Sequence, residues 1–138
     1  MRNLSEIYGD IRRHIGADFP VVRCSSARTP EQMIREVQTI GRTSLPAIIV
    51  FLEEMRFLKQ SPPLRELSVT LLLVDRYRSG SEEQTLSAWN HCEKLYHYFP
   101  SEGIRLHDVF YLPELVYTKG DSLEHDNSLF FFRLLLQQ

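Results

Sequence analysis

Three apolar runs set the narrowest limits on how this chain can fold. They read PAIIVFLEEM at residues 46–55, LSVTLLLVDRY at 67–77 and SLFFFRLLLQQ at 128–138. The last run is far shorter than the roughly 20 apolar residues that a membrane-spanning helix needs. The first is nearly continuous in apolar residues, which is typical of a strand covered on both faces. The runs therefore predict a β-sheet with such a strand near its centre.

Helices are predicted between these strands, because N-capping signals precede stretches with apolar residues at helical spacing. The signals are Asn3 with Glu6, Thr29 with Pro30 and Gln32, and Ser81 with Gln84. The predicted elements are helices over 4–15, 30–40 and 82–99, strands over 20–24, 46–55 and 67–77, a turn or loop over 59–66, and β-structure from 104 onward, broken near Pro113 and in the turn-rich stretch 119–127.

This order of elements predicts an α+β fold in a single domain over 1–138. Consecutive strands are expected to form hairpins, so the sheet should be mostly antiparallel, with about five to six strands. Three helices are expected to pack mainly on one face of it. The length of 138 residues fits one domain, and the composition of 43% hydrophobic and 25% charged residues is that of a folded protein.

Charge and cysteine content narrow the class of protein. The formal net charge of −2 offers no basic field for phosphate backbones, so a dedicated or sequence-specific nucleic-acid binder is not expected.

Cys24 and Cys92 lie far apart without metal-ligand spacing, and we expect both to be buried, reduced thiols. Trp89 is expected in the core as well. The N-terminal stretch lacks the apolar region of a secretory signal, which favours a cytoplasmic protein.

Candidate catalytic residues are few and poorly arranged. His91 and His97 lie six positions apart on a predicted helix and cannot share a metal ion as a pair four apart would. His107 and Asp108 are neighbours in a predicted strand, so their side chains should point to opposite faces. A small enzyme using these two residues and Glu114 is one hypothesis. The sequence otherwise predicts no enzyme, no cofactor and no metal site.

Six arginines concentrate positive charge in the first third of the chain. They are Arg12, Arg13, Arg23, Arg28, Arg35 and Arg42. A solvated surface is the ordinary interpretation. A second interpretation is that these arginines bind an acidic partner surface, either another copy of this chain or nucleic acid that passes nearby.

The last strand has two apolar faces when it is parsed with a period of two. One face carries Phe130, Phe132, Leu134 and Leu136, and the other carries Leu129, Phe131, Arg133 and Leu135. Three helices can cover one face of such a sheet but hardly both, and exposed apolar patches usually mark partner surfaces. We therefore expect oligomerisation through the second face, with Leu129, Phe131, Arg133 and Leu135 as subunit-contact residues. Arg133 would pair with an acidic residue of a neighbouring copy.

Most of the chain, from about residue 4 onward, resembles one protein family in its order of elements. The segments that carry the resemblance are PAIIVFLEE, LSVTLLLVDRYRSGSEE and TLSAWNHCEKLYHYF, followed by a final strand after a polar turn. They are similar to the tail-terminator and tail-completion proteins of long-tailed bacteriophages, including the Mu-like prophage group. The helix over 30–41 departs from the family pattern, in which mostly loop is expected between the first and second strands.

The resemblance implies a structural protein that forms a homo-oligomeric ring, commonly a hexamer. Such a ring caps the tail tube, stops its growth and binds head-completion proteins while leaving a passage for DNA. The chain would then act in the bacterial host cytoplasm during assembly and reside in the virion tail, without contact to a membrane. The alternatives are a neighbouring head-tail connector or a small cytoplasmic adaptor that binds a partner through its apolar sheet face.

Overall fold

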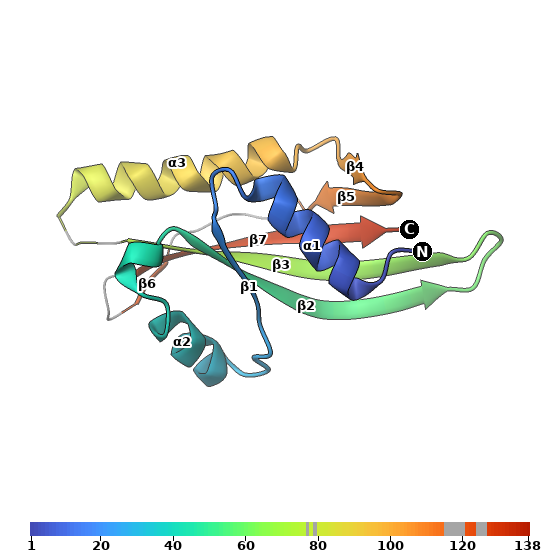
Figure 1. Ribbon diagram of the computed structural model, residues 1–138, viewed down its shortest axis with the longest axis horizontal. Helices are drawn as coiled ribbons and strands as arrows, with labels where there is room; N and C mark the ends of the chain where they lie inside the picture. Colours follow the sequence, from blue (N-terminus) through green and yellow to red (C-terminus); the bar gives the residue numbers. More distant parts are fainter. Residues whose placement is uncertain (77, 79, 115–120, 124–126) are drawn as a thin grey trace.

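The computed structural model describes residues 1–76, 78, 80–114, 121–123 and 127–138 (Figure 1). Its elements in chain order are α1 (Leu4–Ile15), β1 (Val21–Cys24), α2 (Pro30–Gln38), a 3₁₀ turn (Arg42–Ser44), β2 (Ala47–Leu58), β3 (Leu64–Arg76), α3 (Glu82–Tyr98), β4 (Ile104–Leu106), β5 (Val109–Pro113), β6 (Asp121–Leu123) and β7 (Asn127–Gln137). The α+β fold class predicted from the sequence is confirmed.

All the strands of the described residues belong to one sheet. Its order is β1-β2-β3-β7-β5-β4, and the three-residue β6 pairs with β7 as a seventh strand. Only the β1–β2 pair is parallel among the strand pairs described, so the sheet is mostly antiparallel as predicted. The last strand, β7, lies in the interior of the sheet between β3 and β5, which explains why both of its faces are largely apolar.

The helix starts follow the capping signals. Asn3 Oδ1 accepts from the Glu6 backbone N–H at 2.8 Å, and the Glu6 side chain accepts in return from the Asn3 N–H, which completes a capping box. Thr29 caps α2 with proline at the first turn. At α3 the box is incomplete, because Ser81 Oγ accepts from the Gln84 N–H while the buried Gln84 Oε1 atom has no hydrogen-bond partner among the described residues.

The β2–β3 hairpin is longer than the sequence indicated. Strand pairing runs out to Leu58 opposite Leu64, so the connection is five residues, 59–63, and the expected loop over 59–66 is wrong at its C-terminal end. Burial alternates along this stretch, where Arg65 and Leu67 are buried and Leu64 and Glu66 are half-buried, as expected of a strand. In the predicted turn-rich stretch 119–127, only 121–123 and 127 are described, and they belong to β6 and β7.

The helices cover both faces of the sheet, though unequally (Figure 1). Helices α1 and α3 lie on one face, hereafter the α1 face, and α2 lies on the other, hereafter the α2 face. The core of the α1 face buries Ile7, Ile11 and Ile15 of α1 and Cys92, Leu95 and Phe99 of α3 against the sheet. A second core on the α2 face packs Val37 and Ile40 against Ile49, Leu72 and Leu129. Two of three helices thus share one face, and the third covers part of the second face.

The buried stripe of α3 differs from the predicted one. Ala88, Cys92 and Leu95 are its buried positions, whereas Trp89 is 45% exposed. The expectation that Trp89 belongs to the core is wrong, although one face of its ring contacts Phe130 with centroids 4.8 Å apart. Leu86, Trp89 and Cys92 follow one another at three residues each, which is less than the 3.6 residues of one helical turn. These positions therefore shift around the helix and do not all lie on the buried face.

Candidate subunit interface

The uncovered part of the α2 face begins at Phe131. Across the sheet, Leu129 lies opposite Val74, Phe131 opposite Leu72, Arg133 opposite Thr70 and Leu135 opposite Ser68. The second core, beneath α2, includes Leu129, Leu72 and Phe51, the β2 partner of Thr70, but not Phe131 or Arg133. Beyond it, the rows combine apolar and polar side chains and lead to the ion pair of Arg56 with Glu66 at 3.5 Å.

Exposure separates the four predicted contact residues. Phe131 is 40% exposed, Arg133 is exposed and Leu135 is half-buried, so these three lie on an open surface. Leu129 is only 6% exposed because α2 covers it within the same chain. The expectation that Leu129 is available to a partner is therefore corrected, and a subunit contact through the other three stays a prediction.

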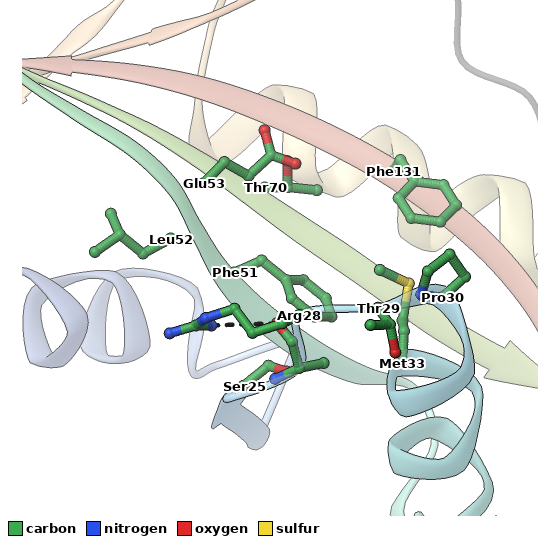
Figure 2. A pocket seen from close by; sticks show the side chains of 11 residues that line it. Ser25, Arg28, Thr29, Pro30, Met33, Phe51, Leu52, Glu53, Thr70 and Phe131 are labelled. Carbon is green, nitrogen blue, oxygen red and sulfur yellow. Dashed lines mark hydrogen bonds between the residues drawn. The ribbon is translucent and has the colours of Figure 1, made fainter.

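A concave pocket adjoins Phe131 on this face (Figure 2). Its volume is about 330 Å³. It lies where the chain leaves β1 and enters α2, so the loop at 25–29 and the first turn of α2 form one wall and the sheet forms the other. The lining residues are Ser25, Ala27, Arg28, Thr29, Pro30, Met33, Phe51, Leu52, Glu53, Thr70 and Phe131. The pocket is thus walled by aromatic and aliphatic groups with charged residues among them, and we call it the Phe131 pocket.

Thr70 gives the Phe131 pocket a polar floor. The residue is 3% exposed, lies opposite Phe51 in β2, and its Oγ1 atom is buried without a hydrogen-bond partner among the described residues. A buried hydroxyl without a partner loses free energy that a donor or acceptor entering the pocket would restore. Nothing in the sequence around Thr70 indicates a pocket.

The loop wall is held by polar contacts of its own. Ser25 Oγ accepts from the Ala27 N–H at 3.0 Å and donates to a carboxylate oxygen of Glu36 on α2. The Arg28 guanidinium donates to the carbonyl oxygens of Ser26 and Ala27. These contacts fix the loop against α2, so the pocket is formed before anything binds to it.

The arrangement of His107 and Asp108 speaks against an active site at these residues. Both have positive φ, at 48° and 66°, and together they form the two-residue turn between β4 and β5, not part of a strand as expected. His107 Nε2 lies 3.8 Å from Asp10 Oδ1, whereas Glu114 follows β5 beside Arg133, to whose carbonyl oxygen its N–H donates. The hypothesis of a three-residue enzyme site gains no support.

One carboxylate–imidazole pair is well formed on the opposite side of the sheet. His91 Nδ1 lies 2.6 Å from Asp75 Oδ2, and Asp75 is 3% exposed. The pair joins α3 to the end of β3 and leaves the His91 ring packed edge-on against Phe19, with centroids 6.3 Å apart. Within the described residues, no group of three metal-ligating side chains is close enough to hold an ion.

The two cysteines differ in environment. Cys92 is 3% exposed, and burial raises the pKa of its thiol to about 11, which suppresses thiolate chemistry. Cys24 is exposed at the end of β1, so the expectation of two buried thiols is correct for Cys92 and wrong for Cys24.

The arginines of the first third of the chain are spread over several surfaces. Arg13 donates to Asp10 and Arg28 to its own loop, whereas Arg12 and Arg35 are exposed. The side chain of Arg42 lies outside what the structure describes. An acidic partner surface for this region stays a prediction.

The chain shows no similarity that would assign a family. No protein-family model matches it, and a search of curated proteins finds no match. None of the helices in the described part of the chain combines the length and the hydropathy needed to cross a bilayer.

Proposed function

We propose that this protein is a structural, non-enzymatic subunit that assembles head to tail into a closed ring through the open part of the α2 face. One observation carries the proposal. On the α2 face, the core beneath α2 buries Leu72 and Phe51, whereas Phe131, which lies opposite Leu72 on β7, stays 40% exposed among the described residues. An aromatic side chain at the rim of a preformed pocket is the kind of group that dominates the energetics of protein interfaces.

Arg133 gives the proposed contact its specificity. It lies exposed between Phe131 and Leu135 on the same face of β7. A guanidinium that loses water in an interface is unfavourable unless a carboxylate pairs with it. An acidic residue of the neighbouring copy is therefore part of the proposal, and it would select one register of docking over others.

The ring that this proposal describes is of the tail-terminator kind. The element order of the chain, with a helix before the sheet, a long hairpin and a long helix before the last strands, supports this reading. Six copies would close around a passage for DNA, cap the tail tube, stop its growth and offer a surface to the head-completion proteins. Assembly would take place in the bacterial host cytoplasm, and the product would remain in the virion tail.

Phe131→Asp tests the assembly. We expect light scattering at high protein concentration to give the mass of a defined oligomer for the unchanged protein and of a folded monomer for the variant, because an aspartate buried in an apolar contact is strongly unfavourable. Leu86→Asp is the matched control, since Leu86 is 56% exposed on α3, away from the α2 face. It should assemble normally.

Two results would contradict the proposal. The unchanged protein could stay monomeric at high concentration and without affinity for tail tubes. Phe131→Asp could also keep the full oligomer mass while circular dichroism shows a folded chain. Affinity capture from the native host distinguishes a tail terminator from an adaptor, because virion proteins are expected to be recovered only with the former.

A further inference from the structure

The outer part of the β2–β3 hairpin exposes apolar side chains that no described element covers. We call residues 55–64 the hairpin arm; Figure 1 shows it reaching past the ends of β5 and β7. Phe57 is 65% exposed and Met55 is 37% exposed. Lys59 follows them as an exposed residue at the turn. An arm with a protruding aromatic side chain and a cation at its tip is suited to enter a cavity.

Phe57 and Met55 lie on the α1 face of the sheet. Phe57 pairs with Arg65 and Met55 pairs with Leu67, and Leu67 belongs to the core beneath α1 and α3. The Phe131 pocket lies on the α2 face. The exposed apolar side chains of the arm and the pocket therefore occupy opposite faces of the same sheet, although both involve β2.

We infer that the hairpin arm of one copy seats Phe57 in the Phe131 pocket of the next copy. This inference rests on the proposed function and names the second surface that a head-to-tail ring needs. The pocket volume of about 330 Å³ gives a phenyl ring room beside Phe51, Met33 and Phe131. The Phe57 side chain and these three lining residues are all apolar.

Polar groups match as well. Glu53 lines the Phe131 pocket and is exposed, and Lys59 lies two residues beyond Phe57 on the arm, so the two charges are opposite in sign. The buried Thr70 Oγ1, which has no partner within the described part of the chain, can accept from a donor on the arriving arm. Charge complementarity of this kind fixes the orientation of docking more than its affinity.

The placement on opposite faces decides between a dimer and a ring. When one arm fills one pocket, the first copy still has an empty pocket and the second still has a free arm. Such a contact joins two different surfaces, so it adds copies one after another, in a ring where the rotation between neighbours closes and in a filament where it does not. The proposed ring is the closed case. A second copy of this chain is therefore the occupant that uses both surfaces at once.

Mixing two variants that each carry one exposed cysteine tests the contact. Both carry Cys24→Ser to remove the exposed thiol, while Cys92 is buried and stays. One adds Gln60→Cys at the exposed tip of the arm, which keeps Phe57, and the other adds Met33→Cys in the Phe131 pocket. With a short bismaleimide reagent, we expect cross-linked dimers in the mixture and none in either variant alone, because each contact joins an arm to a pocket.

Light scattering on the same samples separates this inference from the proposed function. An assembled protein without cross-links in the mixture, or cross-links in the Gln60→Cys sample alone, would overturn the arm-in-pocket contact and leave the ring proposal standing. A protein that remains monomeric would overturn both. A chain that carries both cysteines should give a ladder of products whose largest member has the mass of the closed ring.

Phe57→Ser provides a second test without cross-linking. We expect the concentration for half-assembly to rise at least about tenfold, as for the loss of an aromatic anchor from an interface. Leu86→Ser is the matched control on α3 and should leave that concentration unchanged. An unchanged value for Phe57→Ser, in a variant whose unfolding midpoint equals that of the parent, would overturn the inference.

Discussion

Asp10 carries a carboxylate into the layer between α1 and the sheet. Its side chain is 1% exposed, and its oxygens accept from Arg2 Nε at 3.1 Å, Arg2 Nη2 at 2.7 Å and Arg13 Nη2 at 2.7 Å. Burial by itself raises the pKa of this carboxyl group. The hydrogen bonds from the two guanidinium groups more than offset that effect, so its pKa lies below the ordinary value.

Asp10→Asn removes the charge that these guanidinium groups surround. We expect the free energy of unfolding to fall by about 2 kcal/mol, because hydrogen bonds to a charged group are among the stronger ones and Arg2 keeps only its more exposed ion pair with Glu6 among the described residues. Urea denaturation at neutral pH measures the change. Glu93→Gln is the control. The Glu93 side chain is 69% exposed, and its contact with the exposed His97 side chain is long, at 3.9 Å. Its replacement should therefore change the free energy of unfolding negligibly.

The same residue predicts the direction of a pH effect. A carboxyl group whose pKa is lower in the folded state stabilises the fold above its unfolded pKa, which is about 3.9 for aspartate. That contribution is lost as the pH falls through the lower, folded value. The stability difference between the unchanged protein and Asp10→Asn should therefore be largest near neutral pH and shrink below about pH 4. A difference that grows in acid would contradict the assignment.

Helix α2 is held to the sheet by few side chains. Val37 is 1% exposed in the second core, whereas Ile34 on the same helix is 41% exposed. We expect Val37→Ala to lower the free energy of unfolding by about 2 kcal/mol through lost burial and the cavity left behind. Ile34→Ala should change it by less than about 0.5 kcal/mol. Equal effects in urea denaturation would show that α2 does not pack as described.

Elements were predictable from the sequence where a local pattern carried the signal. The caps at Asn3 and Thr29 and the alternation in β3 and β7 gave helix starts and strand faces. The covering of Leu129 by α2 was not predictable, because it depends on a crossover that carries α2 to the second face. The turn at His107 and Asp108 was also missed, since neither residue is the glycine that usually marks positive φ.

The candidate interface was predictable only in part. Alternation along β7 identified Phe131 as a residue that faces away from the main core, and the structure leaves it exposed. The Phe131 pocket had no sequence signal, because its walls come from the loop before α2, from β2 and from β3, which lie far apart in the chain.

At the scale of the whole molecule, hydrogen exchange can follow assembly without any substitution. Beyond Val50, which pairs with Cys24 of β1, β2 is an edge strand with one side open. In dilute protein we expect amides of the hairpin arm to exchange fast and those of Leu71 to Leu73 to exchange slowly, since the latter lie in the middle of the sheet. Raising the concentration should slow exchange in the arm and around the Phe131 pocket together. Slowing in only one of these two places would contradict a contact between them.

The two ends of the described chain are tied to each other through β3. Arg65 exchanges backbone hydrogen bonds with Gln138, and the Gln138 side chain binds the backbone N–H and carbonyl of Arg2. Contacts with such large sequence separation slow folding, because a long loop must close before they form. During synthesis, the apolar faces of α1 and β3 would stay open to water until β7 has left the ribosome. We therefore expect the sheet to fold cooperatively and only after β7 has been synthesised. Chains truncated before β7 should depend most on chaperones.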